Sequence, residues 1–184
     1  MFPIQPSEFA ESATTQMREM ISRLDLALQR KNCCQSTALK LVSGILSEYL
    51  GNSVLLSEEQ KSFDEENYSR FLLYADPRFS VLALSWLPGQ VSPIHGHNAW
   101  GVVGVHEGEI TNTSYNVVKE TCSVRGPRNV ALASVGRIVA TAEGDEGAHT
   151  LGNLSARPTL TIHIYGMDLS LKPNGINRYY DRLT

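Results

Sequence analysis

Two of the five histidines in this 184-residue chain have a spacing that suits metal ligands. His95 and His97 form a His-x-His pair, and His149 lies far downstream, four residues before Asn153. Side chains at positions i and i+2 of a β-strand point to the same face, so His95 and His97 can direct both imidazoles at one point. Imidazole binds Fe, Zn, Cu and Ni. Taken alone, the pair is equally well explained as two histidines of a surface loop.

A second group of polar residues lies on a segment that alternates polar and apolar side chains. Thr161, His163 and Tyr165 share one face of this segment, and two isoleucines share the other. If the polar face points into the protein, each unpaired group would cost roughly 1–3 kcal/mol. A hydroxyl–imidazole–phenol relay directed at the histidine site would pair all three groups. The alternative is a strand whose polar face meets solvent.

The elements that must position these residues change character along the chain. Up to about residue 50, apolar residues recur at helical spacing, which predicts two helices. The first would begin near Pro6-Ser7, and the second would end at Gly51-Asn52. Their apolar faces comprise Met17, Met20, Ile21, Leu24 and Leu28 in the first helix, and Leu39, Leu41, Val42, Ile45, Leu46 and Leu50 in the second. The acidic stretch 58–66 would be a short helix or loop.

From about Tyr68 onward, short β-type segments alternate with Gly, Pro, Asn and Asp. The predicted strands are 70–74, 80–86, 101–107, 109–118, 138–141, 149–153 and 159–165. Strands at such short intervals favour a sandwich or barrel over alternating βαβ units. We therefore expect one mainly β domain over residues 1–184. Within it, 1–66 would be mainly helical, 67–170 a β-barrel and 171–184 a polar C-terminal tail.

Composition excludes several classes of protein. The chain has 16 Lys and Arg against 19 Asp and Glu, a net charge of −3, which argues against a polybasic nucleic-acid binder. No window approaches the roughly 20 apolar residues of a membrane span, and the first residues lack a signal-peptide pattern, so we expect a cytoplasmic protein. Three cysteines give no disulfide framework, and adjacent Cys33 and Cys34 are expected to be buried structural thiols. His106 is expected to be a surface histidine.

The histidine motifs resemble those of the cupin family. Gly89, five residues, His95-x-His97 and a closing Gly108 match its first motif, and Gly144 with His149-x3-Asn153 matches its second more loosely. The resemblance covers roughly residues 70–170 and implies a double-stranded β-helix, a small jelly-roll barrel. The family's glutamate ligand would fall at position 101 or 102, where this chain has Gly101 and Val102. The site would therefore offer three neutral histidines and no carboxylate, which suits an anionic substrate.

Within the cupins, the chain resembles the thiol dioxygenases, which include cysteine dioxygenase and 3-mercaptopropionate dioxygenase. These enzymes combine a three-histidine Fe(II) site with a Ser-His-Tyr relay, which here reads Thr161, His163 and Tyr165. A Trp-Gly pair after the His-x-His motif is similar to the bacterial members. Mammalian-type enzymes carry near this point a cysteine that crosslinks to the tyrosine. Gly101 and Val102 stand there and Cys122 is distant in sequence, so we expect no thioether.

Arg70, 25 residues before His95, matches the place where cysteine dioxygenases carry an arginine that pairs with the substrate carboxylate. In 3-mercaptopropionate dioxygenases that place is usually glutamine. A guanidinium binds a carboxylate through two charge-assisted hydrogen bonds, so Arg70 favours cysteine. An ordinary surface arginine is the alternative. Lys172 and Arg178 offer a means to bind a second carboxylate, as in mercaptosuccinate.

The resemblance thus implies that Fe(II), held by His95, His97 and His149, brings a small carboxylated thiol together with O2. The product would be a sulfinic acid, with L-cysteine as the favoured substrate. Alternatives are the same chemistry on 3-mercaptopropionate or mercaptosuccinate, a Zn or Ni cupin that catalyses hydrolysis or isomerisation, and a cupin that binds a small molecule without catalysis. The expected partners are the thiol and O2, with no nucleic acid or membrane, in a monomer or small homo-oligomer.

Overall fold

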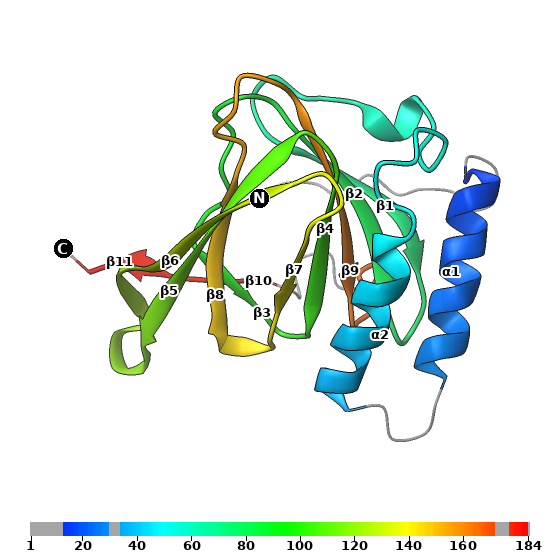
Figure 1. The fold of residues 1–184 in the computed structure, drawn as a ribbon. Coiled ribbons are helices and arrows are strands. Elements are labelled where there is room, and N and C mark those ends of the chain that lie inside the picture. The colour runs from blue at the N-terminus through cyan, green and yellow to red at the C-terminus, as the bar shows by residue number, and fades with distance from the viewer. Residues whose placement is uncertain (1–12, 30–33, 172–176, 184) are drawn as a thin grey trace.

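Two helices pack against a barrel of β-strands in this computed structural model, which describes residues 13–29, 34–171 and 177–183 (Figure 1). The helices are α1 (Thr15–Leu28) and α2 (Gln35–Ser47), with short 3-10 turns at Glu59–Lys61 and Lys119–Thr121. The predicted helix start near Pro6-Ser7 lies outside the described residues. Helix α1 is capped by Thr14, whose hydroxyl accepts a hydrogen bond from the Met17 amide and donates one to the Leu55 carbonyl. The cap therefore also ties the helix to the loop that leads to the barrel.

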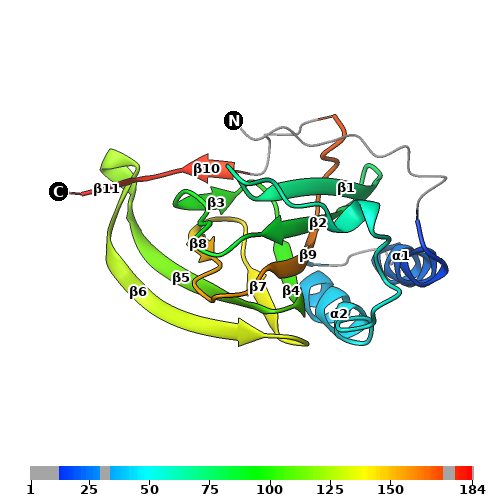
Figure 2. The same cartoon turned by 90° about the horizontal axis from the view of Figure 1, so that it is seen from above.

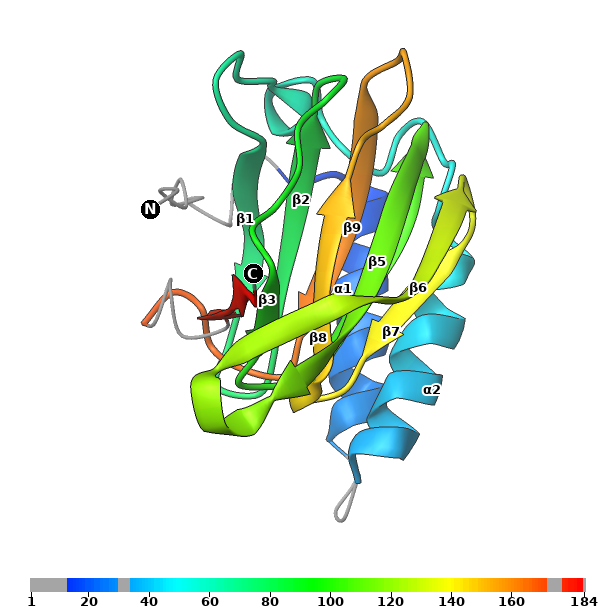
Figure 3. The ribbon, with the colours of Figure 1, turned by 90° about the vertical axis from the view of Figure 1, so that its left-hand side faces the viewer.

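The strands form two sheets that face each other. In the first, the order is β1 (Ser69–Ala75), β2 (Ser80–Trp86), β9 (Thr159–Tyr165), β4 (Gly101–Glu107) and β7 (Ile138–Thr141). In the second, the order is β10 (Asn177–Tyr179), β3 (His95–His97), β8 (Gly144–Gly152), β5 (Glu109–Val118), β6 (Ser123–Ser134) and β11 (Asp181–Arg182). Neighbouring strands are antiparallel except β11 and β6. Figure 3 looks onto the second sheet.

The first sheet is buried on both faces. Figure 2 shows α1 and α2 beside it, on the side away from β5 and β6. Its outer face supplies Val81, Ala83, Val102, Ile162 and Ile164 to a core shared with the helices. Its inner face supplies Leu82, Leu84, Trp86, Val103 and Tyr165 to the barrel interior. Side chains alternate along a strand, so every second residue of β9 packs against the helices. The residues between them point into the barrel.

The seven predicted strands are all present, four further strands were missed, and the reasons for the misses are physical. In β6, Gly126-Pro127 has the composition of a turn. The pairing of β6 with β5 nevertheless continues past it, with a register shift at Tyr115, the partner of Pro127. β3 is only three residues long. β10 and β11 lie in the predicted polar tail, and they pair with β3 and β6 at the two edges of the second sheet. In the part of the chain that the structure describes, no helix is long and apolar enough to cross a membrane.

Two leucines on α1 provide a matched test of helix docking. Leu24 is fully buried in the helix–sheet core, whereas Leu26 is 66% exposed. We expect Leu24→Ala to lower the free energy of unfolding by about 2–5 kcal/mol, because it leaves a cavity in the core. Leu26→Ala should change it by less than about 0.5 kcal/mol. Urea unfolding of both variants measures the difference, and equal losses would show that α1 is not packed as described.

Candidate metal centre

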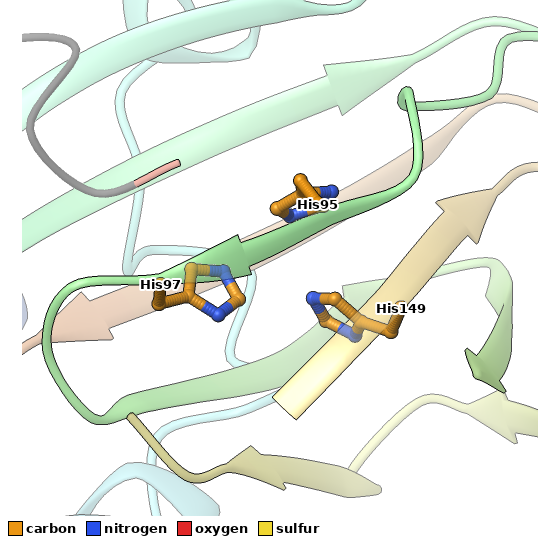
Figure 4. Close-up of side chains that lie close together, drawn as sticks. All are labelled: His95, His97 and His149. Atoms are coloured by element: carbon orange, nitrogen blue, oxygen red, sulfur yellow. The ribbon is translucent and has the colours of Figure 1, made fainter. Parts of the chain in front are cut away.

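His95, His97 and His149 converge inside the barrel (Figure 4). The first two lie on β3 and the third on β8, where His149 is the cross-strand partner of His95. One nitrogen from each ring lies within 4.8 Å of the others, and all three side chains are buried. Burial lowers the pKa of His95 to about 4 and holds the pKa of His97 and His149 well below the ordinary value. The imidazoles are therefore neutral at pH 7, as metal ligands must be.

Hydrogen bonds fix two of the rings in a ligating orientation. Nδ1 of His95 lies 2.9 Å from the Pro93 carbonyl oxygen, and Nδ1 of His149 lies 2.8 Å from Oδ1 of Asn112. Both acceptors require a proton on Nδ1, which leaves the Nε2 lone pair of each ring for a metal. Nε2 of His149 and both ring nitrogens of His97 are buried without a hydrogen-bond partner. A metal ion would satisfy one such nitrogen on each ring, so this donor set fits a divalent metal.

Among the described residues, no aspartate, glutamate or cysteine joins the three histidines. Position 101 faces the ring of Tyr165: a Cβ built on Gly101 would lie 2.9 Å from Cε1 of that tyrosine. Val102 belongs to the core on the helix side of the sheet. The two described cysteines, Cys34 and Cys122, are exposed. The expectation of a buried Cys34 is wrong, since this residue precedes the packed face of α2 as its N-cap, and Cys33 lies outside the described residues.

The polar face of β9 points into the barrel and forms a continuous chain of hydrogen bonds. Oγ1 of Thr161 lies 2.9 Å from Nε2 of His163, and Nδ1 of His163 lies 2.9 Å from the Tyr165 hydroxyl. The indole N–H of Trp86 donates to Oγ1 of Thr161 at 2.9 Å. All seven residues of β9 are buried, so the alternative of a solvent-facing polar strand is wrong.

The relay ends beside the histidines. The ring centroids of Tyr165 and His97 are 5.4 Å apart. Burial raises the pKa of Tyr165 above its ordinary value, so the phenol keeps its proton at neutral pH. Burial, together with the positive charge of Arg70, lowers the pKa of His163 to about 3. The relay therefore consists of neutral groups.

A small cavity of about 20 Å³ adjoins His95 and the relay residues His163 and Tyr165. It is lined by Tyr68, Arg70, Leu84, Trp86, Ser92, His95, Leu151, His163 and Tyr165. Arg70 reaches it from β1 and is half-buried, and no ion pair or hydrogen bond joins its guanidinium to any other described residue. A half-buried guanidinium that lines a cavity without a protein carboxylate is suited to an anionic ligand.

Arg178 does not reach this cavity. It is the cross-strand partner of Gly96, so it lies on the face of β3 opposite the histidines. Its side chain donates to Oδ1 of Asn98 at 2.9 Å and to Oδ1 of Asp145 at 3.4 Å. It lines a separate surface hollow of about 490 Å³. Lys172, the other predicted contact to a second carboxylate, lies outside the described residues.

The remaining motif residues shape turns. Gly89, Gly108 and Gly144 have φ values of 85°, 74° and 84°, which glycine adopts without strain. Asn153 is buried, and its amide nitrogen donates to the carbonyls of Trp86 and Arg157. These residues hold the ends of the strands that carry the site. Sequence analysis missed Trp86 and Asn112, although alternation within their predicted strands would have placed both on the inner face.

His106, expected at the surface, is 1% exposed. It lies on β4 at a register shift between Val105 and Glu107, on the face away from the metal centre, and neither ring nitrogen has a hydrogen-bond partner. Burial is the main cause that lowers its pKa, while Glu107 raises it and Lys61 lowers it. The sequence expectation was wrong because a histidine between valine and glutamate gives no indication that another part of the chain covers that face.

Comparison with known proteins identifies the fold. A sequence model of the family described as cysteine dioxygenase type I matches residues 10–181. Among solved structures, a conserved protein with a double-stranded β-helix domain from Klebsiella pneumoniae is 17% identical with a TM-score of 0.54, covering 71% of this chain and 99% of its own. A protein from Thermus thermophilus is 20% identical with a TM-score of 0.49, over 60% and 92%. The predicted fold, a mainly β cupin double-stranded β-helix with N-terminal helices packed on it, is confirmed.

The buried His106 gives a pH dependence that one substitution should remove. Below the ordinary histidine pKa of 6.5, His106 is protonated in the unfolded chain but stays neutral in the folded protein, where its pKa is lower. The free energy of unfolding therefore decreases as the pH falls. We expect His106→Leu to raise the free energy of unfolding at pH 7, because no unpaired ring nitrogen stays buried. Between about pH 6.5 and 5, its stability should also fall less steeply than that of the wild type, by up to about 1.4 kcal/mol per pH unit. Chemical unfolding at several pH values tests this, and parallel curves would refute it.

Proposed function

The chain belongs to the cysteine dioxygenase type I family, and on this premise we propose that it is an iron-dependent thiol dioxygenase. Its substrate would be a small carboxylated thiol, most favourably L-cysteine. The observation that carries the proposal is the meeting of three groups at one cavity: His95 of the three-histidine cluster, the hydrogen-bonded Tyr165, and Arg70, whose guanidinium has no hydrogen bond or ion pair to a described residue. Each group has a separate task in binding or orienting the reactants.

The histidines would hold the metal. With His95, His97 and His149 as ligands, ferrous iron supplies the open positions at which a thiol, bound as thiolate, and O2 are brought together. Because all three ligands are neutral, the protein does not compensate the metal charge at this point. A neutral or cationic substrate is therefore disfavoured, and a thiol that carries a carboxylate is favoured.

Arg70 would orient the substrate through that carboxylate. A guanidinium donates two parallel hydrogen bonds to the two carboxylate oxygens and so fixes their plane as well as their position. Arg70 shares the cavity with His95, so the carboxylate and sulfur of one small molecule would span the distance between guanidinium and metal. Holding both reactants in one geometry supplies the proximity contribution to the rate.

The relay would control a proton near the sulfur. Tyr165 keeps its phenolic proton, and His163, itself bonded to Thr161, holds the hydroxyl in place. The phenol can therefore donate a hydrogen bond to the reactants without itself becoming charged. In the overall reaction, R–SH and O2 give R–SO2H. Both oxygen atoms end on sulfur, and no external reductant is required.

Oxygen uptake on the iron-loaded protein tests the substrate assignment. We expect cysteine to stimulate O2 consumption more than cysteamine, 3-mercaptopropionate or mercaptosuccinate, with cysteine sulfinate as the product. Arg70→Gln should lower kcat/KM for cysteine by about 10–100-fold, because it removes a charge-assisted pair of hydrogen bonds to the carboxylate. Arg178→Gln is the matched control and should leave all rates unchanged, mercaptosuccinate included.

Each departure from this pattern has a definite meaning. If no thiol stimulates O2 uptake and the protein holds zinc or nickel rather than iron, the proposal is wrong and a hydrolytic or binding cupin replaces it. Should cysteine turnover survive Arg70→Gln intact, the assignment of Arg70 to the carboxylate fails. If Arg178→Gln lowers the rate with mercaptosuccinate alone, the substrate is instead a thiol with two carboxylates.

A separate test addresses Thr161 as a positioning residue of the relay. Thr161→Val removes one hydrogen bond to His163, worth about 1 kcal/mol, so kcat should fall about fivefold with little change in KM. Thr161→Ser keeps the hydroxyl and should restore kcat. Steady-state kinetics separate the two constants. The assignment is wrong if the serine and valine variants lose kcat equally, or if the loss falls on KM alone.

A further inference from the structure

Asn112 lies behind the metal centre and contacts one of its ligands directly. On β5 it shares the inner face with Ile110 and Ser114, and its cross-strand partner on β8 is Leu151. The side chain is 9% exposed, and its Oδ1 accepts the hydrogen bond from Nδ1 of His149 at 2.8 Å. No other described residue bonds to that nitrogen.

We propose that Asn112 is a positioning residue of the metal centre, which fixes the ring of His149 and sets how strongly Nε2 binds the metal. The inference deepens the proposed function and depends on the same three-histidine site. An acceptor on the far nitrogen of a ligating imidazole locks the tautomer and increases the basicity of the ligating nitrogen. For His149 that acceptor is a neutral side-chain amide rather than a carboxylate.

The three ligands differ in how they are supported, and this difference singles out Asn112. His95 has the backbone carbonyl of Pro93 as its nearer acceptor at 2.9 Å, with the Ser92 hydroxyl farther away at 3.4 Å. His97 has no hydrogen-bond partner in the described part of the chain. For His149 the short hydrogen bond, 2.8 Å, comes from a side chain, so the residue at position 112 can tune the metal without touching it.

The other side of the Asn112 amide faces a polar space. A cavity of about 80 Å³ lies behind His149, and the polar residues of its lining are Asn112, Ser114, Arg128, Thr141 and Glu146. Nδ2 of Asn112 has no hydrogen-bond partner among the described residues and is not among the fully buried unpartnered atoms, so solvent in this cavity reaches it. A carboxylate at position 112 could keep one oxygen on His149 and hydrate the other, with the Arg128 guanidinium nearby.

This arrangement predicts opposite effects for two substitutions at one position. Asn112→Leu fills a similar volume but removes the acceptor, so metal affinity should fall by about 10–100-fold. Asn112→Asp replaces the neutral acceptor by a charged one, so affinity should equal or exceed that of the wild type. Asn116→Leu, the same change at an exposed position of the same strand, should have no effect.

The measurement is titration of the metal-free protein with Co(II), followed by its visible absorption and by competition with a chelator. The proposal requires weaker binding and an altered spectrum for Asn112→Leu, together with an unfolding midpoint of the metal-free form close to that of the wild type. It fails if Asn112→Leu binds Co(II) as the wild type does, or if Asn112→Asp binds more weakly than the wild type. If the wild type itself does not bind Co(II) through its histidines, both this proposal and the proposed function are wrong. That result is distinguishable from a failure of the Asn112 proposal alone, in which the wild type binds Co(II).

Discussion

The burial of three uncharged imidazoles at one point is the constraint on which the rest of the structure depends. Removing His95, His97 and His149 from water favours their neutral forms, and the burial that lowers each pKa also frees a lone pair on each ring for a metal. Unpaired buried nitrogens are costly, so an apolar barrel can tolerate the cluster only with partners. The Pro93 carbonyl and the Asn112 amide supply two of them, and a metal would supply the others.

The five-stranded sheet makes room for this polar interior because its two faces have separate tasks. Leu160, Ile162 and Ile164 of β9 pack under the helices and stabilise the sheet from outside. The inner positions of the same strand are thereby released from packing the helices and carry a hydrogen-bonded relay instead. The helices are thus part of the reason that polar side chains can line the barrel: they bury the apolar half of the strands whose other half forms the site.

Parts of the fold and of the candidate site could be predicted from the sequence where a local pattern of residues reflects how the chain packs in three dimensions. Alternation in 159–165 predicted the strand and the shared face of the relay. The spacing of His95 and His97 predicted that these two rings point to one place, and the resemblance to the cupin motifs added His149. Features that depend on partners distant in sequence could not be predicted in this way. The burial of His106 depends on what covers β4, and the role of Asn112 depends on the register between β5 and β8. The pairing of β10 with β3 likewise has no local signature in the polar tail.

The missing carboxylate ligand and the relay follow from one packing fact. Of the two positions where the cupin motif would place a glutamate, Val102 points to the helices, so only position 101 faces the interior. There the ring of Tyr165 lies so close that even a Cβ would be 2.9 Å from it and 3.0 Å from the Thr141 hydroxyl. A glutamate at position 101 and the tyrosine in its observed place therefore exclude each other sterically. The space that would hold a fourth, anionic ligand is given to a neutral phenol. Under the proposed function, the anion that balances the metal charge would therefore arrive with the substrate, and Arg70, which lines the adjoining cavity, would bind its carboxylate.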